Sequence, residues 1–215
     1  MTPKQEKEAV VLVHGLFMNG WEMAVLRHRL AEAGFEPLRF THPTVRQGPS
    51  ANAHALQAFI EAIETERLHF VAHSLGGLVI RYLFHLYPEQ RPGRVVTLGT
   101  PHQGSRAAVR LADYDWGRLI LGESFESGLA GDLPEWTGDY ELGNIAGSYG
   151  LGMGRLLTRL PLPHDGTVAV RETHLPRAKD NLVLPVTHTG LLFSPEVARQ
   201  VVHFLRCGRF EYATH

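Results

Sequence analysis

The chain has 215 residues, of which 44% are hydrophobic and 20% are charged. This composition is typical of a folded globular protein and excludes a disordered chain, and the length suits one domain with a sizeable core. With 21 basic and 22 acidic residues, the formal net charge of -1 provides no broad positive field for nucleic acid or an anionic membrane. We therefore expect a single domain over residues 1–215 that does not bind nucleic acid, and its partners must be inferred from a site.

The cysteine content and the first residues bear on the cellular compartment. The single cysteine, Cys207, cannot form a disulfide within the chain. Residues Met1 to Glu8 are charged and polar where a secretory signal requires an apolar stretch. We therefore expect a cytoplasmic protein without stable membrane insertion, although a mature secreted form without its signal would have a similar sequence. The sequence predicts no oligomeric state.

Short apolar runs alternate with helical patterns along the first half of the chain. The runs typical of buried strands are Ala9–Val13, Phe35–Phe40, Leu68–Val71 and Val95–Leu98. The helical patterns are Trp21–Ala33, Ala51–Arg67 and Leu75–Tyr87, and the second has Leu56, Phe59, Ile60 and Ile63 on one face. Strands that are buried on both faces and joined by helices predict a mostly parallel α/β sheet flanked by helices.

The segment 103–140 interrupts this alternation with glycines, charges and aromatic residues that follow no long period. We predict that it is a lid-like insertion over the sheet. Its apolar residues could fill a core or line an acyl pocket, and we favour the pocket; they are Leu119, Ile120, Leu121, Phe125, Leu129 and Trp136. The alternation then resumes with strands at Leu142–Tyr149 and Leu182–Val186 and a last helix at Pro195–Arg206.

Ser74 lies between small residues, in the stretch Ala72–Gly77, directly after a predicted strand and before a predicted helix. A serine in such a turn can project its hydroxyl from the sheet, where a base can reach it. The first N–H groups of the following helix favour negative charge beside it. Ser74 is therefore a candidate nucleophile, although a serine that only caps the helix would have the same sequence.

Catalytic groups of a parallel sheet gather at the carboxyl ends of its strands, which here carry a possible acid and base. A serine needs a base that takes and returns its proton, and that base is usually a histidine oriented by a carboxylate. We select His188 as the base, with His174 and His203 as alternatives. We select Asp165 as the acid, with Asp139 and Asp180 as alternatives.

The groups that would stabilise the reaction's oxyanion follow the first strand and the serine. Two main-chain N–H donors are needed, and those of Leu16 and Leu75 are the natural candidates. Phe17, next to Leu16, is expected to contact the substrate. The 13 histidines invite a metal hypothesis, but no H-E-x-x-H motif is present and one cysteine excludes a thiolate cluster. We expect neither a metal site nor an organic cofactor.

These motifs together resemble the α/β-hydrolase family, and within it the small bacterial lipases and esterases with an Ala-His-Ser-x-Gly-Gly nucleophile elbow. Four segments carry the resemblance, namely Val13–Gly15, Val71–Gly77, Val96–Gly104 and His188–Ser194. The turn Asp165–Val168 is similar to the acid turn of related lipases over a shorter stretch.

The resemblance implies an α/β-hydrolase fold and a serine hydrolase that cleaves carboxylic esters, of small molecules or lipids, through an acyl-enzyme. In this mechanism Ser74 attacks, His188 carries the proton and Asp165 orients His188. An acyltransferase or amidase on the same triad remains an alternative. A binding protein that keeps the fold without the activity is a further alternative.

Overall fold

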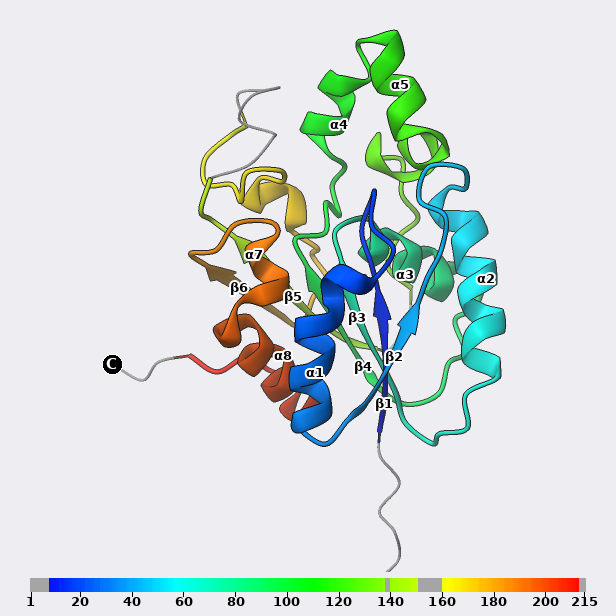
Figure 1. The fold of residues 1–215 in the computed structure, drawn as a ribbon, viewed down its shortest axis with the longest axis vertical. Coiled ribbons are helices and arrows are strands. Elements are labelled where there is room, and N and C mark those ends of the chain that lie inside the picture. The colour runs from blue at the N-terminus through cyan, green and yellow to red at the C-terminus, as the bar shows by residue number, and fades with distance from the viewer. Residues whose placement is uncertain (1–7, 138–139, 151–159, 213–215) are drawn as a thin grey trace, which may run out of the picture.

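A computed structural model of the chain describes residues 8–137, 140–150 and 160–212. Six strands form one sheet in the order β2-β1-β3-β4-β5-β6, and all five neighbouring pairs are parallel. The strands are β1 (Ala9–Val13), β2 (Glu36–Phe40), β3 (Leu68–His73), β4 (Arg94–Leu98), β5 (Glu141–Gly147) and β6 (Asp180–Leu184). The predicted α/β architecture is confirmed, with the sheet entirely rather than mostly parallel (Figure 1).

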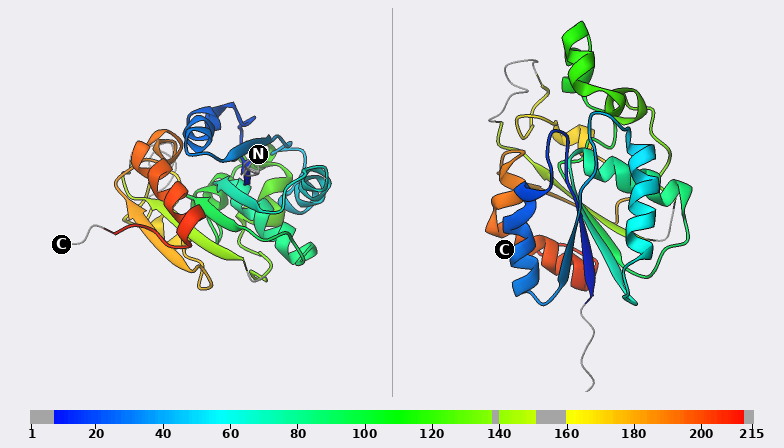
Figure 2. Two further views of the ribbon diagram at one scale, coloured as in Figure 1. Left: turned by 90° about the horizontal axis from the view of Figure 1, so that it is seen from below. Right: turned by 45° about the vertical axis from the view of Figure 1, so that its right-hand side comes forward.

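Helices cover both faces of the sheet (Figure 2). Helices α2 (Pro49–Glu61) and α3 (Leu75–Leu86) pack on one face, against alternate strand residues such as Val11 and Val13. Helices α1 (Ala24–Glu32) and α8 (Pro195–Cys207) pack on the other face, against Val10 and Leu12. A short helix, α7 (Gly190–Phe193), adjoins α1 and α8. Because successive side chains of a strand point to opposite faces, β1 contributes to both cores, as a strand buried on both sides must.

Two predicted helices differ in extent from those observed. The segment expected to be one helix over Trp21–Ala33 is divided into a 3₁₀ turn, η1 (Trp21–Met23), and α1. The pattern expected to run to Arg67 ends with α2 at Glu61. The apolar face correctly predicts the interior of α2, but it continues through Ile63, which packs on the core from outside the helix.

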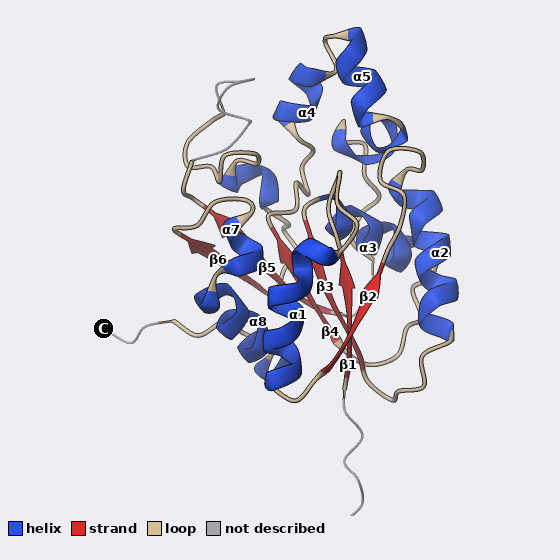
Figure 3. Cartoon of the chain, in the orientation of Figure 1, coloured by secondary structure: helices blue, strands red, loops and turns tan. Residues whose placement is uncertain are grey.

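The interrupting segment forms a cap above the carboxyl ends of the strands (Figure 3). We call residues 105–130 the cap. It consists of α4 (Arg106–Leu111), α5 (Asp115–Leu121) and η2 (Phe125–Leu129). Gly104 and Gly131 stand at the two ends of the cap, and both have a positive φ. They are packed so closely that a Cβ on Gly104 would lie 2.8 Å from Cα of Gly131. The cap therefore leaves and rejoins the body of the protein through a narrow neck.

The strand order places one crevice at the carboxyl edge of the sheet. The chain passes from β1 outward to β2 and then crosses back to β3 on the other side of β1. The residues that follow β1 and β3 therefore meet at the point where the strand order reverses, which is where open α/β sheets bind ligands. A 3₁₀ turn, η3 (Val170–Thr173), lies beyond the sheet near the end of β5. Among the described residues, no helix is both long and apolar enough to cross a bilayer.

Candidate active site

Ser74 occupies a sharp turn between β3 and α3. Its φ of 53° and ψ of -122° lie outside the regions that ordinary residues adopt. The surrounding structure holds this strained turn, because the N–H of Ser74 donates to the Leu98 carbonyl at 2.9 Å and the Thr100 hydroxyl donates to the Ser74 carbonyl at 2.9 Å. A strained residue that its neighbours hold so firmly is typical of a functional site.

The two glycines after Ser74 allow the close packing of this turn. A Cβ on Gly76 would lie 2.4 Å from the carbonyl oxygen of Val13, and one on Gly77 would lie 2.1 Å from Oγ1 of Thr100. Neither space accepts a side chain without displacement of backbone or of a packed threonine. The start of α3 can therefore approach the end of β1 only because glycines stand at these positions.

His188 and Asp165 form a buried pair. Nδ1 of His188 lies 2.6 Å from Oδ2 of Asp165, and the side chain of Asp165 is 1% exposed. The other oxygen, Oδ1, accepts hydrogen bonds from the N–H groups of Thr167 at 2.9 Å and Val168 at 2.7 Å. The backbone N–H of His188 also donates to the carbonyl of Asp165. This arrangement places the imidazole proton on Nδ1 and leaves Nε2 as the free acceptor.

The histidine of this pair and Ser74 open into one cavity. It has a volume of about 240 Å³ and lies between the sheet edge and the cap. Ser74 and His188 both line it, and most of the remaining wall is apolar. Its other lining residues include Leu16, Phe17, Leu75, Ala107, Ala108, Leu111, Leu121, Leu129 and Val168.

The turn after β1 faces the serine across this cavity. We call residues 14–17 the oxyanion turn, because they include Leu16, the predicted oxyanion donor. A Cβ on Gly15 would lie 3.0 Å from Cβ of Ser74, so the two turns are in contact. The N–H of Phe17 donates to Oγ1 of Thr44 at 3.1 Å and is therefore occupied. The N–H of Leu75, the first residue of α3, has no acceptor within its helix. Leu16 and Leu75, the predicted donors, both line the cavity together with Ser74.

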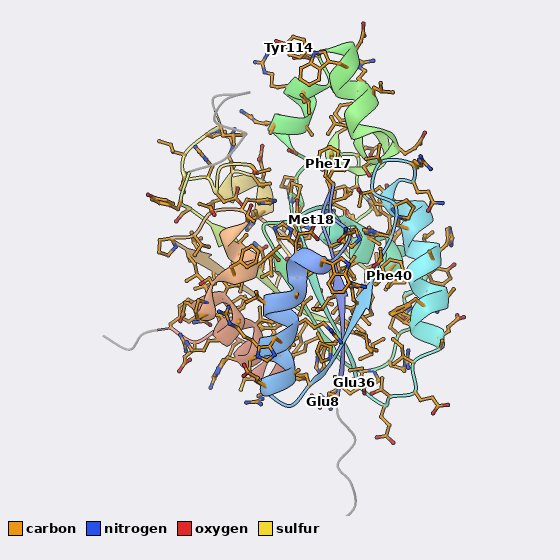
Figure 4. The ribbon with its side chains drawn as sticks, in the orientation of Figure 1. Glu8, Phe17, Met18, Glu36, Phe40 and Tyr114 are labelled. Carbon is orange, nitrogen blue, oxygen red and sulfur yellow. The ribbon has the colours of Figure 1, made fainter. Side chains whose placement is uncertain are left out.

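Not every predicted lining residue reaches the cavity. Leu121 and Leu129 line it, whereas Leu119 is 80% exposed and Trp136 packs in the core against Phe84, with ring centroids 5.0 Å apart. The prediction that these residues form one acyl pocket is therefore wrong for Leu119 and Trp136, and also for Phe125, which packs against a buried cluster instead. The side chain of Ile120 lies outside the described part of the structure. Phe17 lines the cavity with its ring 59% exposed, directly below the cap (Figure 4).

None of the alternative acids and bases in the described part of the chain lines the cavity. Asp180 accepts hydrogen bonds from the backbone N–H of Phe210 and the hydroxyl of Tyr212, at the opposite end of β6 from His188. His203 lies within α8, and His174 is an exposed residue after η3. Asp139 lies outside the described residues. The described residues contain no group of three or more acidic, histidine or cysteine side chains placed to hold a metal ion.

Three histidines around the site are buried and neutral. Nε2 of His73 lies 3.1 Å from the His188 carbonyl oxygen, and burial holds the pKa of His73 well below its usual value. His102 is bonded to the hydroxyl of Thr97, and burial lowers its pKa to about 3. Burial likewise lowers the pKa of His14. These side chains support the turns around Ser74 in their uncharged form.

Two supporting residues were not found from the sequence. Thr100 holds the serine turn, and Thr44 holds the oxyanion turn through a contact that spans 27 positions. Thr100 lies in the segment Val96–Gly104, whose resemblance to lipases was the only signal for it. Thr44 lies in a loop with no periodic pattern, so no signal for it was available.

Several solved structures with a similar fold are lipases or esterases by name. A lipase from Bacillus licheniformis, BlEst2 in its mature form, has a TM-score of 0.71 and 18% identity over 96% of this chain and 94% of its own. A metagenomic carboxyl esterase has a TM-score of 0.67 and 16% identity over 86% of this chain and 65% of its own. A monoacylglycerol lipase from Paleococcus ferrophilus has a TM-score of 0.61 and 16% identity over 93% and 94%. At these identities the likeness shows the α/β-hydrolase fold.

Comparison of the sequence with known families identifies the family of this chain. No curated protein matches the chain. One family, described as Domain of unknown function (DUF7379), matches residues 1–120, more than half of the chain. The matched part contains the oxyanion turn and Ser74 but neither Asp165 nor His188. The chain therefore belongs to the family described as Domain of unknown function (DUF7379), and it has the α/β-hydrolase fold.

Proposed function

We propose that this protein is a serine hydrolase that cleaves carboxylic esters through an acyl-enzyme intermediate, with segment 103–140 acting as a lid over the site. The observation that carries the proposal is that His188, whose Nδ1 lies 2.6 Å from Oδ2 of Asp165, lines the same cavity as Ser74. A buried carboxylate that fixes a histidine beside a serine on a strained turn is the arrangement that activates a serine hydroxyl.

The acylation half of the reaction uses each of these groups once. Nε2 of His188 takes the proton of Ser74 as Oγ bonds to the ester carbonyl carbon, and the π electrons of the carbonyl move to its oxygen. The N–H groups of Leu16 and Leu75 would then donate to this oxyanion. As the tetrahedral intermediate collapses, the bond to the leaving alkoxide breaks and His188 returns the proton to it.

The deacylation half repeats these steps with water. His188 takes a proton from water, the hydroxide oxygen bonds to the acyl carbon, and the ester bond to Ser74 breaks as His188 returns the proton to Oγ. The Asp165 carboxylate stabilises the imidazolium in both halves. Because Thr167 and Val168 already donate to its other oxygen, the carboxylate is fixed before any substrate binds.

The cavity supports a small acyl group as substrate. Its volume of about 240 Å³ is below the range of pockets that hold drug-sized ligands. Leu121 and Leu129 from the cap and Val168 from the acid turn give it apolar walls. We therefore propose esters of short to medium fatty acids as the preferred class, with the acyl chain between the oxyanion turn and the cap.

Hydrolysis of p-nitrophenyl esters from acetate to palmitate tests the proposal. We expect wild-type turnover with a maximum at short to medium chain length. Ser74→Ala should lower kcat by about 10⁴-fold or more while the far-UV circular dichroism spectrum is unchanged. Ser148→Ala is the matched control, because the Ser148 hydroxyl donates to the Leu184 carbonyl outside the cavity. Turnover in Ser74→Ala at the rate of the control would contradict the proposal.

A further inference from the structure

One loop contacts both the oxyanion turn and the cap. We call residues 41–48, between β2 and α2, the bridging loop. Thr44 lies near its centre and is 7% exposed. The side chain of Thr44 faces the oxyanion turn, whereas its carbonyl faces the cap. The loop therefore connects two parts of the site that are not neighbours in sequence.

The hydroxyl of Thr44 fixes Phe17. The N–H of Phe17 donates to Oγ1 of Thr44 at 3.1 Å, and Phe17 has a φ of 60°, which is unfavourable for a residue with a side chain. The N–H of Leu16 belongs to the preceding peptide unit, which joins the fixed Leu16–Phe17 unit at Cα of Leu16, so its direction depends on φ and ψ of Leu16 and on how firmly that next unit is held. A hydrogen bond that holds the strained Phe17 thus also holds the proposed oxyanion donor.

A second contact holds the beginning of the same turn. Nδ1 of His14 lies 3.0 Å from the Gly15 carbonyl, and the N–H of His42 donates to Nε2 of His14 at 3.3 Å. These partners require the tautomer with the proton on Nδ1, so that one ring donates on one side and accepts on the other. The bridging loop therefore forms hydrogen bonds with both ends of the oxyanion turn, through His42 to His14 and through Thr44 to Phe17.

The cap rests on the other side of the bridging loop. The hydroxyl of Ser124, which is fully buried, donates to the Thr44 carbonyl. The N–H of Glu123 donates to the carbonyl of Val45 at 3.1 Å. Gly122 has a φ of 56°, and a Cβ there would lie 2.1 Å from the same Val45 carbonyl. The end of α5 is thus seated on the bridging loop at residues 44 and 45.

We propose that Thr44 is a positioning residue that couples the seating of the cap to the orientation of the Leu16 N–H in the oxyanion hole. The inference rests on the proposed esterase function. Its physical basis is that one residue holds the oxyanion turn through its hydroxyl and the cap through its carbonyl. Movement of the cap that breaks the hydrogen bond from Ser124 to the Thr44 carbonyl would free Thr44 to move. The hydrogen bond that holds the strained Phe17 would then weaken as well.

Three variants of the bridging loop test this proposal. Thr44→Val removes the acceptor of the Phe17 N–H at nearly constant volume, and Thr44→Ser restores a hydroxyl. Thr41→Val is the matched control, because the Thr41 hydroxyl lies in the same loop but donates to the Asn19 carbonyl. The readouts are kcat and KM for p-nitrophenyl butyrate and the Ki of 1,1,1-trifluoro-2-octanone. This ketone bonds to Oγ of a serine nucleophile and carries an oxyanion on its former carbonyl oxygen, with the hydroxyl proton passing to the histidine.

For Thr44→Val we expect kcat to fall and the trifluoroketone Ki to rise by about 10-fold each, less than the loss of a whole oxyanion donor, while KM changes by less than about twofold. Thr44→Ser should recover most of both effects, and Thr41→Val should match the wild type. Ser124→Ala, which leaves the Thr44 hydroxyl in place, should lower kcat in the same direction through the cap. A merely structural role would lower the stability without this division between kcat and KM.

Other outcomes overturn the inference. Wild-type kcat and Ki in Thr44→Val, a loss that serine does not recover, or an effect on KM alone would each contradict it. If Thr44→Val does not fold, the inference fails when Ser124→Ala keeps the wild-type kcat and Ki. A wild-type protein that neither hydrolyses the ester nor binds the ketone would overturn the proposed function, and the inference with it. If the wild type is active, one of the outcomes above overturns only the role of Thr44.

Discussion

At the scale of single residues, the proposed chemistry depends on the proton position of one imidazole. The Asp165 carboxylate lies against Nδ1 of His188, so the ring can accept a proton only through Nε2. The carboxylate is itself fixed by two backbone N–H donors, and its side chain is almost completely buried. The orientation of His188 is therefore set by the acid turn rather than by the substrate.

Asp165→Asn tests this dependence directly. The amide can keep Oδ1 toward Thr167 and Val168, which directs its NH₂ group at Nδ1 of His188 and favours the tautomer with the proton on Nε2. That tautomer cannot take the serine proton, so we expect kcat to fall by about 10³- to 10⁴-fold with little change in KM. Steady-state kinetics with p-nitrophenyl butyrate measures both quantities.

Asp180→Asn is the control for this prediction, because Asp180 binds Phe210 and Tyr212 away from the cavity. We expect its kcat/KM to stay within about twofold of the wild type. Equal losses in the two variants would show that Asp165 acts only through stability.

The size of the cavity gives a prediction about the length of the acyl chain that the protein accepts. Ala107 and Ala108 line it from α4, and Ala107 is half-buried. Ala107→Phe should fill part of its volume and move the preferred acyl chain toward acetate, with kcat/KM for the longest accepted ester lowered by at least about 10-fold. An unchanged chain-length profile in the same p-nitrophenyl ester series would place the acyl chain elsewhere.

At the scale of elements, the cap is seated by glycines with positive φ. Gly122→Ala should destabilise the protein, because a Cβ there meets the Val45 carbonyl and adopts an unfavourable φ. Gly34→Ala is the matched control, since its φ of 92° carries the same type of strain but nothing lies within 4 Å.

We expect the control to lose about 1–2 kcal/mol of unfolding free energy and Gly122→Ala to lose more, together with a fall in kcat that the control does not show. Urea denaturation and ester hydrolysis of both variants measure the difference. If the two variants lose the same unfolding free energy and the same kcat, the contact between the cap and the bridging loop has no role in the site.

The elements that could be predicted are those with a strong local signal. The strands β1 and β4 and the interiors of α2, α3 and α8 follow from runs or periods of buried residues. Ser74 and His188 could be selected as candidates because each follows a predicted strand. The short helices of the cap have six and seven residues, too few to show a helical period. Thr44 was missed because its role arises only when the bridging loop meets Phe17 and Ser124 in three dimensions.

At the scale of the whole molecule, buried histidines make stability depend on pH. Burial lowers the pKa values of His42 and His102 to about 3 each. The unfolded chain binds these protons below about pH 6.5 and the folded protein does not, so their contribution to stability is complete above pH 6.5 and is lost as the pH falls toward 3. We expect the unfolding free energy to decrease on acidification through this range by about 1.4 kcal/mol per pH unit for each of the two groups.

His42→Phe isolates one of these contributions. Neither ring nitrogen of His42 has a hydrogen-bond partner, and the ring already packs against Phe40, so phenylalanine keeps the packing without the titration. We expect the slope of unfolding free energy against pH between 6 and 4 to become shallower by about 1.4 kcal/mol per unit. Urea denaturation at several pH values gives this slope, and an unchanged slope would contradict the assignment.

The central claim is that the sheet, the acid turn and the oxyanion turn together make Ser74 a nucleophile. The most direct measurement is mass spectrometry after treatment with an alkyl fluorophosphonate, in which Oγ of the serine bonds to phosphorus, fluoride leaves and the hydroxyl proton is taken by the histidine. We expect one label per chain on the peptide that contains Ser74, none in Ser74→Ala and much slower labelling in His188→Ala. A folded wild-type protein that stays unlabelled, or that carries the label on another residue, would contradict the central claim.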